Sequence, residues 1–261
     1  MIKVDEKYKM IYITEDLDEG VKVAFSTKHG GVSRTHLASM NMSYNREDDV
    51  GNVDENYRRL KEVMGISDMN LYMVHQVHGD RIRTVTGKES PGYFEEARFD
   101  AQITNIPGSA LAVNHADCTP LLFYDGEKRA IAAVHSGWKS TLLEIAAKTV
   151  REMNDRFGTE AGKLKVWIGP SISSECYEVK EDVYTQFKEQ LSWAAEGFFK
   201  QQGEGSYLLD VRGIVKESLL RCGVKNIKDM GFCTWQNSGL FFSHRRDKGH
   251  TGTMTGIISL K

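Results

Sequence analysis

Residues 101–135 read AQITNIPGSALAVNHADCTPLLFYDGEKRAIAAVH, and they contain the most apolar part of the chain. This stretch predicts four strands in close succession, over 101–106, 110–114, 121–124 and 130–135. Two of these runs are almost continuously apolar, which is typical of strands that are buried on both faces of a sheet. A buried sheet is therefore expected at the centre of the fold.

The rest of the chain alternates between strand-like and helix-like patterns with short loops between them. Further strands are predicted over 21–26, 71–74, 82–86, 165–168, 232–234, 240–243 and 254–260. Helices are predicted over 52–64, after Gly137, over 181–191 and over 211–222. Strands mixed with helices in this way predict an α/β or α+β fold, a layered sandwich of mixed β-sheet flanked by helices.

Two of the predicted helices carry local signals. Asn52 can cap the first helix, and Glu55 follows three residues later as in a capping box. The helix after Gly137 has an apolar stripe that consists of Leu142, Leu143, Ala146, Val150 and Met153. Such a stripe predicts an amphipathic helix.

Length and composition are those of an ordinary globular protein. The 261 residues are 40% hydrophobic and 27% charged, and they contain no repeat, low-complexity stretch or Pro/Ser linker. We therefore expect a single domain over residues 1–261. Lys and Arg number 34 against 36 Asp and Glu, a net charge of −2. This balance gives no sign of a nucleic-acid or anionic-membrane partner.

Nothing in the sequence predicts export or membrane insertion. Charges interrupt the first seven residues too early for a signal peptide, and no run of about 18 apolar residues occurs. The four cysteines form no C-x-x-C pair; they are Cys118, Cys176, Cys222 and Cys233. A cytoplasmic location is the simplest interpretation, and the cysteines are then free thiols or metal ligands.

The fragment His-Ser-Gly-Trp-Lys at 135–139 joins the end of a buried strand to a helix start. Unsatisfied backbone N–H groups at a helix start favour anions, and Gly137 lets a ligand approach the backbone closely. The fragment suits a metal ligand, His135, beside a phosphate-sized anion. The alternative is a capped helix start with a buried histidine, and the fragment alone favours that alternative.

The fragment Asn-His-Ala-Asp-Cys-Thr-Pro at 114–120 places polar and reactive side chains at the end of an apolar strand. Sites on layered sheets are usually built at such strand ends. Cys118 is a zinc-bound thiolate, a nucleophile or simply a small buried hydrophobe. Asp117 either orients a ligand or forms an Asx-turn before Pro120.

The fragment His-Gln-Val-His-Gly-Asp at 75–80 holds two histidines three residues apart. In an extended chain they point to opposite faces, so at most one of them is expected to reach a metal. His78, Cys118 and His135 together supply the three N and S ligands that a catalytic zinc takes with one position left open. These three residues lie far apart in the sequence, so the sequence alone does not show that they meet in the folded protein.

Other kinds of site are not indicated. The sequence has no G-x-S-x-G elbow, no G-x-x-x-x-G-K-[ST] phosphate loop and no H-E-x-x-H zinc helix. It also has no H-x-H pair, which argues against a multicopper cluster.

Several motifs in the same order resemble the YfiH/YlmD family, whose members are labelled laccase-domain proteins, polyphenol oxidoreductases, purine nucleoside phosphorylases and peptidoglycan editing factors. They run from Asn41-Met42-Ser43 to the C-terminus. The matching segments are VDENYRRL, HQVHGDRI, DAQITN, LAVNHADCTPLLF, AAVHSGW, IGPSIS followed by CYEV, and FFSHRRDKGHTGTM.

The resemblance implies a YfiH-like sandwich and a zinc ion bound by His78, Cys118 and His135. It also implies phosphorolysis of adenosine, inosine, guanosine and methylthioadenosine to the base and a pentose 1-phosphate. Adenosine deamination is implied as a second activity. The expected ligands are therefore purine nucleosides, phosphate and zinc, with copper as the second choice of metal.

Further residues are expected to complete this pocket. Asn41 and Arg58 would hold phosphate or ribose, because an arginine offers a forked pair of donors. Asp100 would act as a base or orient a zinc-bound ligand. Gly137 would help to bind phosphate, and Cys118 is a candidate nucleophile. Arg58 can also be a plain helix-surface charge, and Asp100 a strand cap.

The chain departs from the family's usual pattern at three places. It has Asn41-Met42-Ser43 for Asn-Leu-Ser, residues 135–139 as HSGWK for HAGW-R, and Ser243 to Asp247 as SHRRD for SYRRD. Lys139 lacks the bidentate fork of arginine, which weakens any phosphate role at that position. No expected metal ligand is missing.

Three other functions stay open. The same zinc centre fits an amidase that edits a peptidoglycan precursor. A copper-dependent polyphenol oxidase would fit the laccase label. The centre could also belong to a non-catalytic metal-binding module.

Overall fold

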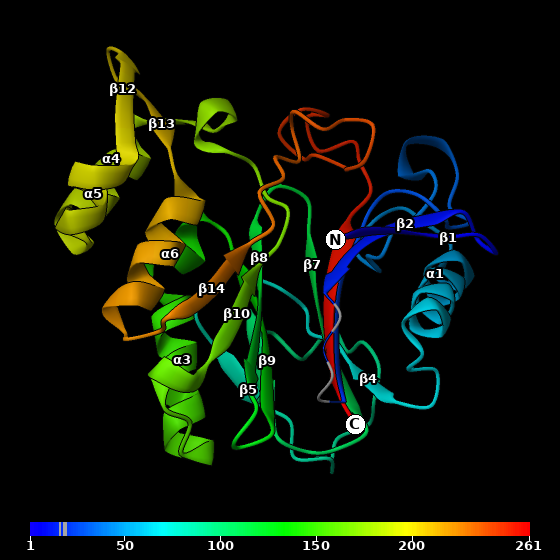
Figure 1. Cartoon of the computed structure of the whole chain (residues 1–261). Coiled ribbons are helices and arrows are strands. Elements are labelled where there is room, and N and C mark those ends of the chain that lie inside the picture. Colours follow the sequence, from blue (N-terminus) through cyan, green and yellow to red (C-terminus); the bar gives the residue numbers. More distant parts are fainter. Residues whose placement is uncertain (16, 18–19) are drawn as a thin grey trace.

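The computed structural model describes residues 1–15, 17 and 20–261, and two six-stranded sheets packed face to face dominate it (Figure 1). The first sheet has the strand order β1-β2-β3-β15-β7-β4, and the second has the order β14-β10-β8-β9-β6-β5. Both combine parallel and antiparallel neighbours. The predicted layered sandwich of mixed sheet and helices is confirmed.

The elements have the following bounds. The first sheet consists of β1 (Ile2–Asp5), β2 (Met10–Glu15), β3 (Val21–Ser26), β15 (Met254–Leu260), β7 (Ser109–His115) and β4 (Asn70–Tyr72). The second consists of β14 (Asn226–Asp229), β10 (Lys165–Ile168), β8 (Thr119–Asp125), β9 (Ala130–Ser136), β6 (Ala101–Thr104) and β5 (Ile82–Thr84). A small third sheet contains β11 (Glu178–Lys180), β13 (Ser206–Leu209) and β12 (Phe199–Gly203). The helices are α1 (Val50–Met64), α2 (Trp138–Leu142), α3 (Ile145–Phe157), α4 (Glu181–Gln190), α5 (Ser192–Phe198) and α6 (Val211–Arg221).

The alternation of side chains along the central strands explains their continuous apolar runs. In β8, Leu122 and Tyr124 pack between the two sheets, whereas Leu121 and Phe123 face the opposite way, towards the helices. Each face of the strand is therefore covered, as the sequence predicts for strands buried on both faces.

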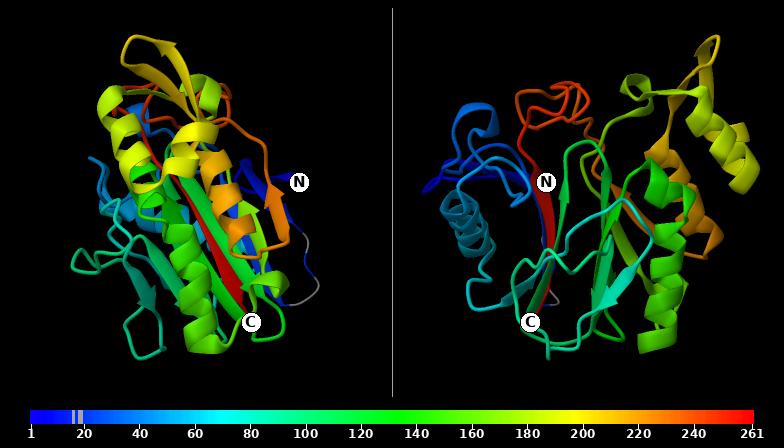
Figure 2. Two further views of the ribbon diagram at one scale, coloured as in Figure 1. Left: turned by 90° about the vertical axis from the view of Figure 1, so that its left-hand side faces the viewer. Right: turned by 180° about the vertical axis from the view of Figure 1, so that it is seen from behind.

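Helices cover both outer faces of the sandwich. Helix α1 lies on the first sheet, while α3 and α6 lie on the second (Figure 1). The β12–β13 ribbon projects from one end, next to α4 and α5 (Figure 2). None of the helices in the described residues combines the length and the apolar composition that crossing a bilayer requires. That residues 1–261 form one domain stays a prediction.

Two predicted strands, over 232–234 and 240–243, are wrong. Cys233 pairs with Ser171 only in an isolated bridge, and residues 234–236 and 238–240 form turns, in which the N–H groups of Asn237 and Phe241 bind the carbonyl groups of Cys233 and Asn237. Phe241 and Phe242 are nevertheless buried in the core between the sheets. The apolar run therefore reflects side-chain burial in a loop and not a strand.

Two predicted helix details are also corrected. Asp49 caps α1 by accepting a hydrogen bond from the N–H of Gly51, so the helix begins before Asn52, and Glu55 binds arginines instead of closing a capping box. The helix expected after Gly137 is split into α2 and α3, because Glu144 adopts a left-handed backbone with φ of 57°. The β1–β2 hairpin, β14, α5 and the small third sheet are present in the structure but are not predicted from the sequence.

The cap of α1 gives a stability prediction. Asp49→Ala should lower the free energy of unfolding by about 1 kcal/mol, because the helix loses the acceptor for a terminal N–H group. Glu47→Ala, in the same loop and exposed, should change it by less than about 0.5 kcal/mol. Urea unfolding followed by circular dichroism measures both. A larger loss from Asn52→Ala would restore the original assignment of the cap.

Candidate metal centre

Three segments meet at one end of the sandwich and bring the three expected ligands together. His78 lies in the loop that follows β4, and His135 lies near the end of β9. Cys118 lies in the turn between β7 and β8, which belong to different sheets. The group therefore sits where the chain crosses from one sheet to the other.

The three side chains are close enough to share one ion. Their candidate ligand atoms all lie within 4.8 Å of one another. Cys118 Sγ is 3.7 Å from His78 Nε2, and the rings of His78 and His135 meet edge to face with centroids 4.7 Å apart. Within the described residues this is the only group of three or more histidine, cysteine or acidic side chains placed in this way.

The buried carboxylate of Asp100 holds two of the three ligands in place. Its Oδ1 accepts hydrogen bonds from His135 Nδ1 and from the backbone N–H of His78, both at 2.9 Å. Its Oδ2 accepts from the N–H groups of Gly79 at 2.7 Å and Val77 at 3.2 Å. Nε2 is therefore the ring nitrogen of His135 that can bind a metal after losing its proton, and the loop that carries His78 is fixed to the same carboxylate.

Two residues at the site have an unusual backbone conformation. His78 and Asp117 have φ values of 59° and 92°, in a region that side chains other than glycine rarely adopt. Asp117 is held there by two hydrogen bonds, because its carboxylate accepts the hydroxyl of Thr234 at 2.5 Å and the N–H of Arg245 at 2.6 Å. The turn that carries Cys118 is thus tied to a loop more than 100 residues away in sequence.

Gly137 leaves the space that the ligands occupy. A Cβ atom at this position would lie 2.8 Å from His78 Cδ2 and 3.1 Å from Cys118 Sγ. Its φ of −79° and ψ of 176° suit any residue, so close approach and not conformation requires the glycine.

The electrostatics of the group favour a thiolate. Burial disfavours the ionised forms of both Cys118 and His135, but each stabilises the charge of the other. As a result the pKa of Cys118 lies below its ordinary value and that of His135 lies above it. Burial likewise disfavours the charge of Asp100, yet its hydrogen bonds, above all that from His135, hold its pKa below the usual range.

The donor set fits a metal ion. Two imidazole nitrogens and a thiolate are the N and S ligands that zinc prefers, and three protein ligands are typical of a catalytic site. The carboxylate behind His135 is the partner that metal-binding histidines usually have. Type 1 copper also uses two histidines and a cysteine, so the donor set alone fits either metal.

The group opens onto a cavity of about 380 Å³. Four aromatic residues line it, namely Tyr44, Tyr93, Trp138 and Tyr177. Among its other lining residues are His115, which burial keeps neutral by lowering its pKa to about 3, and the two arginines Arg46 and Arg245. None of the four aromatics or the two arginines is predicted from the sequence as a site residue, although Trp138, Tyr177 and Arg245 stand in the segments HSGWK, CYEV and SHRRD.

The remaining expected residues lie in different places. Asn41 is buried and binds Ser43, Asp48 and Thr253, so it holds the loop that lines the cavity and does not line the cavity itself. Arg58 is not brought to the metal group. It lies on the outer face of α1, where Glu55 and Glu62 bind its guanidinium.

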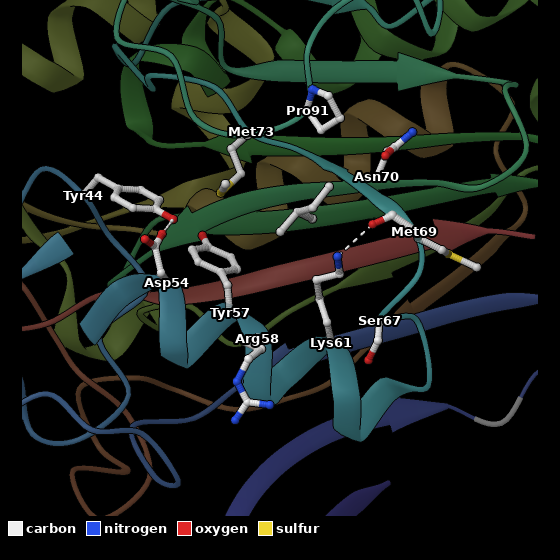
Figure 3. Close-up of a pocket in the computed structure, with 12 residues that line it drawn as sticks. Tyr44, Asp54, Tyr57, Arg58, Lys61, Ser67, Met69, Asn70, Met73 and Pro91 are labelled. Atoms are coloured by element: carbon white, nitrogen blue, oxygen red, sulfur yellow. Dashed lines mark hydrogen bonds between the residues drawn. The ribbon is translucent and has the colours of Figure 1, made fainter. Parts of the chain in front are cut away.

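Arg58 lines a separate cavity of about 400 Å³ between α1 and residues 67–73 (Figure 3). Figure 3 shows its side chain on α1 at the edge of this cavity, away from Met73 and Pro91. The position of Arg58 therefore matches the alternative prediction, that its side chain is a charge on the surface of the helix. The alternative prediction for Asp100, that it only caps a strand, does not explain the four hydrogen bonds that its carboxylate accepts.

Known proteins with a similar chain share this architecture. Residues 22–261 match the family described as multi-copper polyphenol oxidoreductase laccase. The chain is 37% identical to a purine nucleoside phosphorylase of Deinococcus radiodurans, over 91% of this chain and 88% of that one. It is 31% identical to the purine nucleoside phosphorylase YlmD of Bacillus subtilis, over 95% and 91%. The crystal structure of the Bacillus licheniformis hypothetical protein YfiH superposes with a TM-score of 0.90 at 31% identity, covering 100% of this chain and 99% of that one.

The close packing at Gly137 gives a test of the metal site. Gly137→Ala should fold normally but bind zinc at least about tenfold more weakly, because the new methyl group displaces His78 and Cys118. Gly203→Ala, where a methyl group meets no neighbour within 4 Å, is the matched control. Zinc titration against a chelator measures both. Equal affinities would show that the three side chains do not share the ion.

The charge state of the group predicts proton release. Near pH 7 the raised pKa of His135 keeps its ring protonated without metal, while the lowered pKa of Cys118 leaves a thiolate. Zinc requires the neutral imidazole, so binding should release about one proton, and affinity should fall about tenfold for each pH unit lowered. Calorimetry in buffers with different ionisation enthalpies measures this number. Affinity that does not change with pH would contradict the ion pair.

Proposed function

The chain belongs to the multi-copper polyphenol oxidoreductase laccase family, which includes the YfiH and YlmD proteins, and from this premise we propose that it is a zinc-dependent purine nucleoside phosphorylase. The reaction converts a nucleoside and phosphate to the free base and a pentose 1-phosphate. The proposal is carried by the joint position of His78, Cys118 and His135 at a cavity of nucleoside size. The activity in the names of the relatives supports it.

His78, Cys118 and His135 would hold the zinc, which supplies a Lewis acid that polarises a substrate oxygen. Asp100 would act as a positioning residue, because all of its hydrogen bonds go to the ligand His135 and the loop that carries His78. We therefore assign Asp100 no role as a base. Cys118 would serve as a ligand, since donation of electron density to the zinc would lower the nucleophilicity of the thiolate.

The cavity wall suits a purine nucleoside. Aromatic side chains offer flat apolar surface for a base, and the four that line this cavity come from separate segments of the chain. Asn41 would position the loop that carries Tyr44, through its bonds to Ser43 and Thr253. Adenosine, inosine, guanosine and methylthioadenosine share the purine and are the proposed substrates. Gly137 would contribute by leaving room for the side chains of His78 and Cys118 at the metal.

Adenosine deamination is a second proposed activity of the same centre. Zinc deaminases use a water activated by zinc and a glutamate as acid and base. No glutamate is found among the described residues that line the cavity, and the carboxylate of Asp117 is occupied by Thr234 and Arg245. The wall of the cavity therefore favours phosphorolysis over deamination. A cytoplasmic location remains a prediction from the sequence.

One assay decides between these reactions. Zinc-loaded protein is incubated with adenosine, with and without phosphate, and all products are separated by chromatography. We expect adenine and ribose 1-phosphate only with phosphate, and His78→Ala should lose at least about 100-fold in kcat/KM, as removal of a metal ligand implies. His36→Ala, which lies outside the cavity, should keep full activity.

Other outcomes have definite meanings. Inosine formed without phosphate would make deamination the main activity. Absence of any product at stoichiometric zinc would overturn the nucleoside proposal. The peptidoglycan-precursor amidase would then be the preferred function. Phenol oxidation in proportion to bound copper would instead support the polyphenol oxidase.

A further inference from the structure

One guanidinium in the metal cavity has no carboxylate partner in the described part of the chain. Arg46 lies in the loop after β3, is half-buried, and lines the same cavity as the metal group. Its Nε donates to Thr253 Oγ1 and its Nη1 to the carbonyl of Gly249, each at 3.3 Å. Both acceptors are neutral, and the distances are long for such bonds.

The charge of Arg46 is therefore poorly compensated. Burial lowers the pKa of Arg46, and no carboxylate offsets that effect. The arginines of α1 provide the contrast, since Arg58 and Arg59 both bind Glu55. A desolvated charge without a counter-ion costs free energy that a bound anion would recover.

The surroundings of Arg46 add positive charge. The carbonyl of Gly249 that it binds belongs to the loop that also carries His244 and Arg245, and both of these line the cavity. The guanidinium of Arg245 lies over the ring of Tyr177 at 4.6 Å and donates to the carbonyl of Glu178, whose carboxylate is close enough for Arg245 to lower its pKa. This part of the cavity wall thus carries two arginines.

The one carboxylate on the same wall already has hydrogen-bond partners. Asp117 is the one carboxylate among the described lining residues, and Thr234 and the backbone of Arg245 occupy its two oxygens. No carboxylate of the cavity wall therefore pairs with either arginine, and Arg46 also has no carboxylate partner outside the wall in the described residues. A ligand that completes the charge balance has to be an anion.

We infer that Arg46, with Arg245 on the adjoining loop, binds the phosphate cosubstrate in the metal cavity. This inference rests on the proposed function and assigns to Arg46 the role that the sequence analysis gave to Arg58. The planar fork of a guanidinium matches two phosphate oxygens, and two arginines suit a dianion. The metal group and these arginines line one cavity, so phosphate and nucleoside can occupy it together.

The first test measures anion binding without catalysis. Inorganic phosphate is titrated into zinc-loaded protein at constant ionic strength, and calorimetry gives the affinity. We expect saturable binding that Arg46→Gln weakens at least about tenfold, as loss of a charge-assisted pair implies. Arg58→Gln, whose side chain lines the other cavity, is the matched control and should bind phosphate like the parent chain.

The second test separates the two substrates kinetically. Arg46→Gln should raise the KM for phosphate at least about tenfold while the KM for adenosine stays within about threefold. Arg46→Lys keeps the charge but loses the fork, so it should recover part of the lost phosphate affinity. Zinc content and the melting temperature of each variant check that the loop still holds its shape, since Arg46 also binds Thr253 and Gly249.

The outcomes for the inference and for the proposed function can be told apart. An active enzyme whose phosphate KM is unchanged in Arg46→Gln, or is raised equally in Arg58→Gln, would overturn the inference and leave the function standing. Phosphate binding that depends on Arg46 in a protein without phosphorylase activity would keep the anion site and overturn only the reaction. Partial recovery of phosphate affinity in Arg46→Lys with intact zinc would support the bidentate contact, and full recovery would contradict it.

Discussion

A single buried carboxylate connects the fold to the metal centre. Asp100 stands just before β6 of the second sheet and accepts four hydrogen bonds, three from the backbone of residues 77–79 and one from His135. A buried charge is tolerated only when its hydrogen bonds are complete, so the loop and the end of β9 have to keep their relative positions. The orientation of His78 and His135 is therefore decided before any metal arrives.

The arrangement of the sheets places the third ligand beside them. Cys118 sits in the turn that carries the chain from one sheet to the other, and Asp117 anchors that turn to a distant loop. Gly137, which has no side chain, leaves the space in which the sulfur and the His78 ring lie. The cavity joins a thiolate and two imidazoles to a wall with two arginines, which is a suitable environment for a neutral nucleoside and an anion together.

Local sequence predicts some of these features and not others. The central strands follow from apolar runs, and Gly137 and the three ligand positions stand in short distinctive fragments. Residues 240–243 have the apolar pattern of a strand but do not form one, because Phe241 and Phe242 reach the core from a turn region. Arg58 and Arg46 cannot be distinguished from sequence, since only the fold shows that the first is bound by glutamates and the second faces the cavity. Charge compensation depends on contacts between segments far apart in the chain.

X-ray absorption at the zinc edge is the decisive measurement for the metal centre, because it reports the ligands and not the activity. With one equivalent of zinc bound, we expect one sulfur at about 2.3 Å and two imidazole nitrogens at about 2.0–2.1 Å, with the remaining ligand a light atom. The sulfur shell should vanish in Cys118→Ser. A spectrum without sulfur, or with a sulfur that persists in Cys118→Ser, would contradict the assignment of the centre.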